Sequence, residues 1–279
     1  MSNSDNISFS CEFFPPKTDK GQENLEAALV ALKPLNPEYI SCTYGAGGTT
    51  QEGTFETIQH IQQHGIPAVP HMTCIGSTRE KISGLLQQYK DAGCQGIVAL
   101  RGDLPEGMED PGEFHYANEL VEFIREQTGD HFEIEVAAYP EKHPQSANMQ
   151  DELLNYVRKV EAGANTAITQ YFYNADAWLR FVDDAERLGA SIPVIPGIMP
   201  ITNYKQLARF SSACGAEIPR WITSRLEGYG DDLDSIREFG FDVTLQLCEQ
   251  LIDAGAHGLH FYSMNRAEPT VRLHKELGL

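Results

Sequence analysis

The stretch Ser8-Phe-Ser-Cys-Glu-Phe-Phe-Pro-Pro16 has the composition of a buried β-strand, and the way it ends separates two α/β architectures. A doubly wound open sheet usually carries a glycine-rich phosphate loop directly after its first strand. Two phenylalanines followed by two prolines cannot form such a loop. The run Gly45-Ala-Gly-Gly48, after the second predicted strand, is a weak match and is more typical of a flexible turn. The first strand therefore favours a closed barrel.

Seven further short apolar runs, rich in β-branched and aromatic residues, follow along the chain. The eight predicted strands lie at about 8–14, 38–45, 67–74, 96–103, 132–140, 166–173, 193–200 and 258–265. The first seven begin about 25–35 residues apart, which is the length of a strand–helix unit. Eight such units in 279 residues, with no linker or composition break, predict an α/β protein with a single (β/α)8 barrel, a TIM barrel, over residues 1–279.

Amphipathic helices are predicted between these strands. Ser77 and Glu80 have the spacing of a capping box, and an apolar stripe follows at Ile82, Leu85, Leu86 and Tyr89. The same spacing recurs at Ala117, Leu120, Val121 and Ile124. Four glycines are expected to end helices just before the next strand: Gly93, Gly163, Gly189 and Gly255. The segment from about 203 to 255 is longer than the other crossovers, which predicts two or three extra helices before the last strand.

Charge and cysteine usage exclude several classes of protein. The chain has 21 basic and 40 acidic residues, a net charge of −19, so neither nucleic acid nor an anionic membrane is expected as a partner. Its six cysteines are scattered without a C-x-x-C pair, which is typical of reduced core thiols and not of disulfides or a zinc site. No apolar run is long enough to span a membrane, and the first residues do not resemble a secretory signal, so a cytoplasmic protein is expected.

Polar side chains gather at the carboxyl ends of the predicted strands, which is where barrel enzymes carry their active sites. They are Glu12, Thr43, Tyr44, His71, Thr73, Arg101, Asp103, Tyr139, His143, Gln170, Tyr262, Asn265 and Arg266. Taken singly, Glu12 could belong to a structural ion pair, and His71 is more often a hydrogen-bonded core histidine than a ligand. Their coincidence at seven of eight strand ends favours an active site.

Two helices leave alternatives open. In the helix at about 148–164, Glu152, Asn155, Arg158 and Lys159 lie beside an apolar stripe of Leu153, Leu154, Val157 and Val160. Periodicity alone favours a solvated polar face, although Arg158 and Lys159, with Arg101, are suitable cations for a phosphorylated ligand. In a later helix Phe210 lies one turn after Gln206 and continues an apolar stripe with Leu207 and Cys214, so spacing alone places Phe210 in the core.

Eight ordered motifs give the chain a resemblance to a known family. They are Glu12-Phe-Phe-Pro-Pro16, Thr43-Tyr-Gly45, Pro70-His-Met-Thr-Cys74, Ala99-Leu-Arg-Gly-Asp-Leu-Pro105, Val136-Ala-Ala-Tyr-Pro140, Ala167-Ile-Thr-Gln170, Pro196-Gly-Ile-Met-Pro200 and His260-Phe-Tyr-Ser-Met-Asn-Arg-Ala-Glu268. Along essentially its whole length the chain resembles the bacterial form of methylenetetrahydrofolate reductase. The longer eukaryotic form carries a C-terminal regulatory domain, and the resemblance to the bacterial form implies that no counterpart of it is expected here.

The resemblance implies an FAD-dependent barrel that reduces 5,10-methylenetetrahydrofolate to 5-methyltetrahydrofolate by ping-pong hydride transfer from NADH or NADPH, supplying methyl groups for methionine synthesis. It also implies a homo-oligomer, a dimer or tetramer. The matching FAD-binding positions are Thr43, His71, Arg101, Gly102, Asp103, Tyr116, Ala117, Ala137, Tyr139, His143, Glu152, Asn155, Arg158 and Lys159. Glu152 replaces an aspartate of relatives. The positions expected to face folate or nicotinamide are Glu12, Asp103, Gln170, Gln206, Phe210 and Arg266.

The implied chemistry suits two carboxylates with different roles. Opening the five-membered ring of the folate requires a proton on N10 and yields an iminium ion at N5. Glu12, between Cys11 and two phenylalanines, has the apolar sequence neighbours that would raise the pKa of its carboxyl and keep it protonated as the acid. Asp103 is expected to stay ionised, stabilising positive charge on the substrate and tuning the flavin.

Two other classes of function compete with this interpretation. A metal-dependent barrel hydrolase would use His71, His143 and Asp103, but the first strand offers no histidine to complete the usual cluster, and no metal ion is expected. A non-catalytic binding or scaffold protein would not need a ring of polar groups at the barrel mouth.

Overall fold

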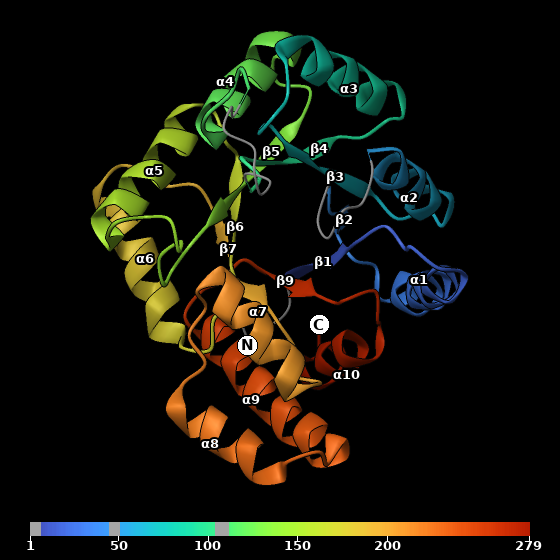
Figure 1. Ribbon diagram of the computed structural model, residues 1–279, viewed down its shortest axis with the longest axis vertical. Helices are drawn as coiled ribbons and strands as arrows, with labels where there is room; N and C mark the ends of the chain where they lie inside the picture. Colours follow the sequence, from blue (N-terminus) through green and yellow to red (C-terminus); the bar gives the residue numbers. More distant parts are fainter. Residues whose placement is uncertain (1–6, 45–50, 104–111) are drawn as a thin grey trace.

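The computed structural model describes residues 7–44, 51–103 and 112–279, and the run Gly45–Gly48 lies outside them. Parallel strands form a barrel that is surrounded by helices (Figure 1). The strands are β1 (Ser8–Phe13), β2 (Ile40–Cys42), β3 (Ala68–Thr73), β4 (Gly96–Leu100), β5 (Glu133–Ala138), β6 (Thr166–Thr169), β7 (Val194–Ile195), β8 (Gly197–Ile198) and β9 (Gly258–Tyr262). All eight predicted strand positions are occupied, which confirms the (β/α)8 barrel.

The seventh predicted strand is divided by Pro196 into two short strands that close the barrel. β7 pairs with β6 on one side, and β8 pairs with β9 on the other. Proline has no N–H to donate to a strand ladder, but the carbonyl of Pro196 still accepts a hydrogen bond of 3.0 Å from the N–H of His260. At Gly197 a Cβ atom would lie 2.2 Å from the carbonyl oxygen of Thr169, so only glycine allows the close approach made here.

The helices follow the strands in sequence order. They are α1 (Asp19–Leu32), the short 3-10 helix η2 (Lys33–Leu35), α2 (Gln51–Gln63), α3 (Arg79–Asp91), α4 (Ala117–Thr128), α5 (Met149–Glu161), α6 (Ala175–Arg187), α7 (Tyr204–Cys214), α8 (Arg220–Tyr229), α9 (Leu233–Asp253) and α10 (Glu268–Leu277). Helices α7, α8 and α9 confirm the expected extra helices before the last strand. Within the described residues, no helix is long and apolar enough to cross a membrane.

Local helix signals are confirmed with one correction. The apolar stripe of α3 is buried as its spacing predicts, and so is that of α4 except at Ala117, which is half-buried and lines a cavity. The four predicted glycines all have positive φ just after a helix. The predicted cap at Ser77 is wrong: Thr78 caps α3, and its hydroxyl accepts a hydrogen bond of 3.2 Å from the N–H of Lys81. Ser77 is itself buried, one residue before the cap.

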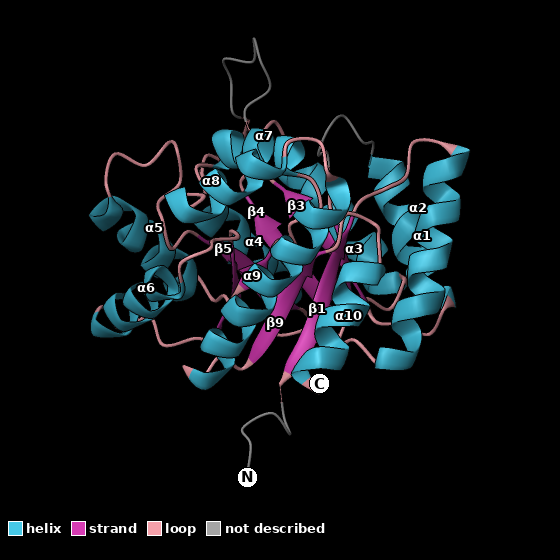
Figure 2. Cartoon of the chain, turned by 90° about the horizontal axis from the view of Figure 1, so that it is seen from below, coloured by secondary structure: helices cyan, strands magenta, loops and turns pink. Residues whose placement is uncertain are grey.

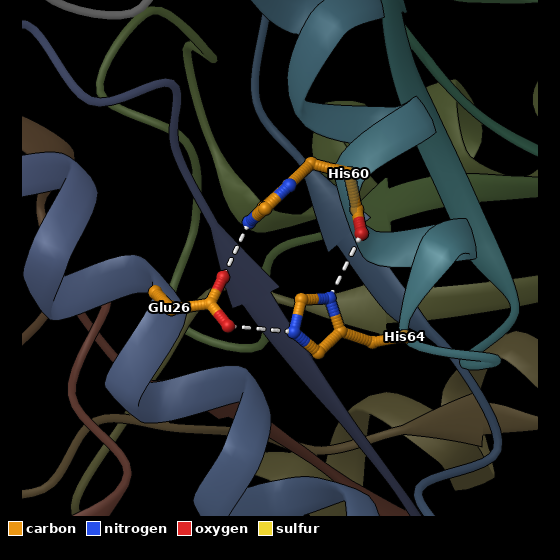
Figure 3. Close-up of side chains that lie close together, drawn as sticks. All are labelled: Glu26, His60 and His64. Atoms are coloured by element: carbon orange, nitrogen blue, oxygen red, sulfur yellow. Dashed lines mark hydrogen bonds and ion pairs between the residues drawn. The ribbon is translucent and has the colours of Figure 1, made fainter.

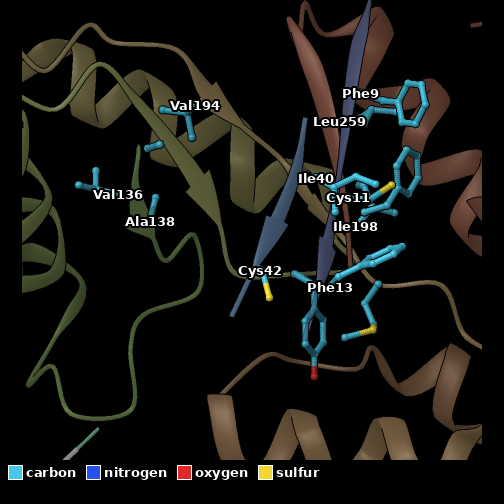
Figure 4. Close-up of a cluster of buried hydrophobic side chains, with 14 of the residues drawn as sticks. Phe9, Cys11, Phe13, Ile40, Cys42, Val136, Ala138, Val194, Ile198 and Leu259 are labelled. Carbon is cyan, nitrogen blue, oxygen red and sulfur yellow. The ribbon is translucent and has the colours of Figure 1, made fainter. Parts of the chain in front are cut away.

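Figure 2 shows from a second direction that helices cover the outside of the strands. The main apolar core is built from side chains of both the strands and these helices. Phe9, Cys11 and Phe13 of β1 point into this core (Figure 4). Because successive side chains of a strand point to opposite faces, Ser10 and Glu12 point into the barrel. The interior is therefore partly polar: the hydroxyl of Ser10 lies 2.7 Å from Nδ1 of His260, beside a small apolar cluster of Val69, Val98 and Ile168.

Candidate active site

Among the cavities formed by the described residues, two at the carboxyl end of the barrel contain predicted site residues. The larger, which we call the α5 cavity, has a volume of about 530 Å³ and lies between the ends of β4 and β5 and helices α4 and α5. The smaller, the α7 cavity, has a volume of about 230 Å³ and lies between the ends of β1 and β9 and helix α7. Their positions agree with the placement of active sites in (β/α)8 barrels.

The α5 cavity gathers all but two of the predicted FAD-binding positions. These lining residues are Arg101, Gly102, Asp103, Tyr116, Ala117, Ala137, Tyr139, His143, Glu152, Asn155, Arg158 and Lys159. They come from two strand ends and two helices that are separate in sequence, so the fold itself assembles the set. Thr43 and His71 lie outside this lining, on or just after the neighbouring strands β2 and β3.

The polar face of α5 is not a solvated surface, which corrects the expectation from periodicity. Glu152 is 3% exposed and Lys159 is 8% exposed. Burial lowers the pKa of Lys159 to about 8, and the nearby Glu152 carboxylate opposes this shift. The Lys159 amine donates a hydrogen bond to the carbonyl of Ala137. Asn155 is half-buried and Arg158 exposed; the Arg158 guanidinium donates to the Asn155 side chain at 2.7 Å. The face therefore presents one buried and one accessible cation to the cavity.

The predicted apolar stripe of α5 is wrong at one position. Leu154 is 38% exposed and lines the cavity, while Tyr156, which was outside the predicted stripe, is fully buried against Phe181. A period of 3.6 residues cannot distinguish an apolar side chain that faces the core from one that faces a cavity. The cavity therefore has apolar as well as charged walls.

The loop after β5 adds lining residues that the sequence did not single out. Gln145, Ser146 and Ala147 line the α5 cavity. The Arg101 guanidinium donates to the side chain of Gln145, and the hydroxyl of Ser146 donates to the buried carboxylate of Glu152, each at 2.5 Å. The available signal is positional, because loops that follow barrel strands line the active-site face.

Inside the barrel mouth, Glu12 and His71 form a contact between two strands that are not adjacent. Nε2 of His71 lies 3.5 Å from a carboxyl oxygen of Glu12 and 3.2 Å from the hydroxyl of Ser41 on the intervening strand. Burial raises the pKa of Glu12 to about 8 and lowers the pKa of His71 to about 3. Both groups are therefore mainly uncharged at neutral pH, and the contact is not an ion pair. Glu12 keeps 23% of its side chain exposed but is not among the lining residues of the α5 or the α7 cavity.

The expected burial of Glu12 is found, but its expected cause is wrong. Cys11 and Phe13 are completely buried in the apolar core. Because successive side chains of a strand point to opposite faces, both point away from the carboxyl group of Glu12. The register instead places Glu12 beside Ser41 on β2 and Tyr262 on β9. The carboxyl is therefore desolvated by the barrel interior, not by its sequence neighbours.

Thr43 and Gln170 lie at strand ends but outside both cavities. The hydroxyl of Thr43 is buried and has no hydrogen-bond partner within residues 7–44, 51–103 and 112–279. Gln170 follows β6, where its N–H donates to the carbonyl of Ala138 and its side-chain oxygen accepts from the N–H of Tyr171 at 3.0 Å. The geometry therefore orients Gln170 but does not place it on the described cavity walls.

The α7 cavity brings together Gln206, Phe210 and Arg266, three of the predicted substrate-facing residues. Phe210 is half-buried: it packs on the core and also lines the cavity, so spacing alone assigned it only part of its surroundings. Gln206 and Arg266 are exposed. The sequence did not single out Phe14, Asn24, Met199 and Thr202, which also line this cavity. Phe14 and Met199 lie inside or beside quoted motifs, which was the available signal.

A strained turn holds the α7 cavity against the end of β1. Met264 and Asn265 have φ angles of 53° and 55°, in the left-handed region that non-glycine residues rarely adopt. The buried Asn265 side chain accepts from the N–H of Phe14 at 2.9 Å and donates to its carbonyl at 2.8 Å. The hydroxyl of Ser263 donates to the carbonyl of Glu12. These bonds fix Glu12 and Arg266 relative to each other.

The residues required by a metal-dependent hydrolase do not form one group. His71 contacts Glu12 inside the barrel, whereas His143 and Asp103 line the α5 cavity. In the described part of the chain, one set of three residues has ligand atoms close enough to hold a metal ion, and it lies away from the mouth, on α1 and α2. The mouth therefore favours chemistry based on carboxyl groups and cations.

Comparison with known proteins agrees with this geometry. The sequence model of the methylenetetrahydrofolate reductase family matches residues 1–278. The chain belongs to this family. It is 38% identical over 274 residues to the 5,10-methylenetetrahydrofolate reductase of Pectobacterium carotovorum subsp. carotovorum, covering 98% of this chain and 91% of the relative. Family membership makes the protein an oxidoreductase.

A plant relative and a solved structure extend the comparison. The chain is 36% identical over 285 residues to methylenetetrahydrofolate reductase (NADH) 1 of Zea mays, covering 97% of this chain but 48% of that longer protein. The fold of this chain is similar to that of an uncharacterized protein from Clostridium thermocellum that binds two copies of 5-methyl-5,6,7,8-tetrahydrofolic acid. The TM-score is 0.69 at 17% sequence identity, and the match covers 99% of this chain and 96% of that chain. This last likeness supports the barrel fold.

Proposed function

We propose that the protein reduces 5,10-methylenetetrahydrofolate to 5-methyltetrahydrofolate, with FAD as its cofactor and NADH or NADPH as the electron donor. The observation that carries the proposal is Glu12, an uncharged carboxylic acid whose burial raises its pKa to about 8 at a barrel mouth. The family match supports the folate, and the plant relative that is named for NADH supports a nicotinamide donor.

The α5 cavity suits FAD by the chemistry of its donors. Arg101, Arg158 and Lys159 supply cations for a pyrophosphate in a protein with a net charge of −19. Tyr116, at the start of α4, and Leu154, on α5, add exposed apolar surface to the lining of this cavity, which suits aromatic rings. The volume of about 530 Å³ is within the range of cofactor sites.

Two features beside this cavity support the same cofactor. Gly102 has a φ of 84°, and a Cβ atom there would lie 3.0 Å from side-chain atoms of Thr73 and Ile75, so the backbone is left bare at the cavity wall. The buried hydroxyl of Thr43, which has no hydrogen-bond partner in the described part of the chain, lies at the end of β2, two strands from β4, and offers a further hydrogen bond. When bound, FAD would supply a two-electron relay between the nicotinamide and the folate, which makes a ping-pong order natural.

Glu12 is the proposed general acid. Ring opening of the folate requires a proton at N10, and a carboxylic acid that remains protonated near neutral pH can donate it. His71 is uncharged and cannot hold Glu12 as a carboxylate through an ion pair, so the neighbouring imidazole preserves the acid form. The hydrogen bond from Ser263 to the carbonyl of Glu12 orients the strand end that carries the acid.

Asp103 and the α7 cavity are proposed to position the substrates. Asp103 is exposed at the end of β4 and faces the α5 cavity, where a carboxylate stabilises positive charge on the folate as its ring opens. Phe210 offers an aromatic face, and Gln206 and Arg266 offer hydrogen-bond donors, to a pterin, glutamate or nicotinamide group. Gln170, at the end of β6, is proposed as a further substrate contact.

Anaerobic half-reactions of the purified protein test this proposal. The protein is expected to be yellow, to lose its flavin absorbance with NADH or NADPH, and to recover it when methylenetetrahydrofolate is added. Removing the flavin is expected to abolish activity, whereas treatment with a chelator leaves it intact. A colourless protein that binds no added FAD, or a reduced protein that methylenetetrahydrofolate does not reoxidise, would contradict the proposal.

The proposed location of the protein is the cytoplasm. All six cysteines are free thiols, which suits a reducing compartment.

A further inference from the structure

Away from the barrel mouth, helices α1 and α2 bring one carboxylate and two imidazoles together (Figure 3). Glu26 comes from α1, His60 comes from the last turn of α2, and His64 follows directly after the end of that helix. Nε2 of His60 lies 2.8 Å from one carboxylate oxygen of Glu26, and Nε2 of His64 lies 3.0 Å from the other. The three ligand atoms lie within 4.8 Å of one another.

We propose that Glu26, His60 and His64 form a binding site for a divalent transition-metal ion of the zinc type, which joins α1 to α2. Imidazole nitrogens and a carboxylate oxygen are preferred ligands of such ions, and water completes the coordination when the protein supplies three. Ligands about 2.0–2.1 Å from a tetrahedral ion are about 3.3 Å apart. The observed N–O separations of 2.8 and 3.0 Å would open by a fraction of an ångström, and the other ligand-atom separations, all within 4.8 Å, would adjust towards the same value.

The orientation of His64 supports a ligand role. Its Nδ1 lies 3.1 Å from the carbonyl oxygen of His60, so the Nδ1–H donates to that carbonyl. In the neutral ring this leaves the lone pair of Nε2 pointing at a carboxylate oxygen of Glu26, which is also an acceptor. A cation between the two acceptors resolves the conflict. A backbone carbonyl bonded to the second ring nitrogen is also the usual device that orients a metal-binding histidine.

The surroundings allow an ion to enter and favour positive charge. The side chains of Glu26, His60 and His64 are 47%, 27% and 18% exposed, so water can reach the site and supply the remaining ligands. The net charge of −19 attracts cations. The ammonium group of Lys33 lies close enough to His64 to repel a cation at this site. Lys33 is exposed, and its long side chain can turn towards solvent. The competing interpretation is a hydrogen-bonded cluster in which both imidazoles carry an extra proton and no metal binds.

Titration of the full-length protein with Zn²⁺ distinguishes the two interpretations. After treatment with a chelator and its removal, calorimetry is expected to show one Zn²⁺ per chain at this site, with a Kd of about 1 µM or below. His60→Ala and His64→Ala are each expected to weaken binding about 100-fold, and Glu26→Gln about 10-fold, because each removes one ligand or its charge. His257→Ala is the matched control, since His257 is an exposed histidine before β9 that lies outside this group.

Thermal melting provides a second measurement. Zn²⁺ at about 100 times its Kd is expected to raise the Tm of the parent protein by roughly 5 °C and that of His257→Ala equally. The double variant His60→Ala/His64→Ala is expected to melt cooperatively but to show no shift with Zn²⁺. The proposal is overturned if the parent protein binds no Zn²⁺ at about 100 µM, or if the double variant binds it as tightly as the parent. FAD content does not enter this test, so it is independent of the proposed reductase activity.

Discussion

Nε2 of His71 lies 3.5 Å from a carboxyl oxygen of Glu12, and burial makes both groups mainly neutral at pH 7. If the proton of Glu12 moved to His71, the pair would consist of a carboxylate and an imidazolium, and Glu12 would have no proton to donate in acid catalysis. Because desolvation disfavours the charged form of each group, the proton stays on Glu12. The pair thus keeps an acid available at the barrel mouth.

Glu12→Gln is expected to separate the two half-reactions. The amide keeps the size of the side chain but cannot donate a catalytic proton, so reoxidation of the reduced enzyme by methylenetetrahydrofolate should slow about 10²–10⁴-fold. Flavin content and reduction by the nicotinamide should stay within about twofold of the parent. Stopped-flow absorbance measures both steps. Equal slowing of the two would show that Glu12 has a structural role instead.

The rate of the folate half-reaction is expected to depend on the acid form of Glu12. Since burial raises its pKa to about 8, the rate should be constant below that pH and fall about tenfold per pH unit above it. Reduction by the nicotinamide should show no such fall. Stopped-flow profiles between pH 6 and about 10 test this. The same fall in Glu12→Gln would assign it to another group.

Arg158→Ala is expected to weaken FAD retention without destabilising the fold. Arg158 is exposed on the wall of the α5 cavity, so its loss leaves no buried group unpaired. Flavin content after dialysis should fall, and it should fall further at high salt because the remaining attraction is screened. Arg187→Ala, which removes an exposed arginine of α6 paired with Asp184, is the control. Equal flavin retention in the parent, Arg158→Ala and Arg187→Ala would show that Arg158 is a solvated surface residue that does not hold FAD.

Glu135→Gln is expected to change how stability depends on pH. Glu135 is 6% exposed inside the barrel and accepts a hydrogen bond of 2.5 Å from the Tyr39 hydroxyl. Burial, aided by Glu38 and Glu133, raises its pKa from 4.5 to about 7 and outweighs the Tyr39 bond, which lowers it. Between these values the folded chain holds a proton that the unfolded chain has released. The free energy of unfolding therefore falls as pH rises through this window, by up to about 3 kcal/mol.

Glutamine can still accept the Tyr39 hydrogen bond but has no proton to lose. Urea unfolding at pH 5 and at about pH 8 should therefore show a smaller loss of stability in Glu135→Gln than in the parent. Glu12 contributes a loss of the same sign to both proteins, so the difference between them isolates Glu135. Identical losses would mean that Glu135 is already ionised at pH 5.

The strands could be predicted because each is a short apolar run bounded by turn residues, and this local signal survives in the folded barrel. The division of the seventh strand at Pro196 depends on hydrogen bonds to two different neighbours, β6 and β9, which only the closed barrel brings together. The shift of the α3 cap from Ser77 to Thr78 is a one-residue choice between two similar hydroxyls, and sequence spacing does not decide it.

The sequence predicted which residues belong to the site, but not how deeply each of them is buried or what covers it. Motif resemblance and strand ends supplied most residues of the α5 cavity. The burial of Glu152 and Lys159 could not be predicted, because a helical period shows which residues share a face but not what covers that face. Likewise Glu12 has neighbours on β3 and β9 that lie far away in sequence, so the flanking Cys11 and Phe13 indicated the wrong cause for its burial.

Phe210 is the residue for which helical spacing and family resemblance disagree, and the structure gives it both environments. It packs on the core and lines the α7 cavity, one turn after Gln206. If its main role is in the core, Phe210→Ala should cost about 3–5 kcal/mol of stability through the cavity it leaves. If it stacks on nicotinamide or folate, the Tm should change little and KM should rise several-fold, since such stacking contributes about 0.5–1.5 kcal/mol.

We expect the second result, because the side chain is only half-buried and faces the same cavity as Arg266. Gln206→Ala should raise KM in the same direction but by less, with an unchanged Tm, because Gln206 is exposed and its side chain carries no packing role. Leu207→Ala is the matched core control: Leu207 is 4% exposed on the same helix and should lower the Tm strongly. Steady-state kinetics with each substrate and thermal melting of all three variants measure these effects. A drop in the Tm of Phe210→Ala as large as that of Leu207→Ala, with unchanged KM for both substrates, would place Phe210 in the core alone.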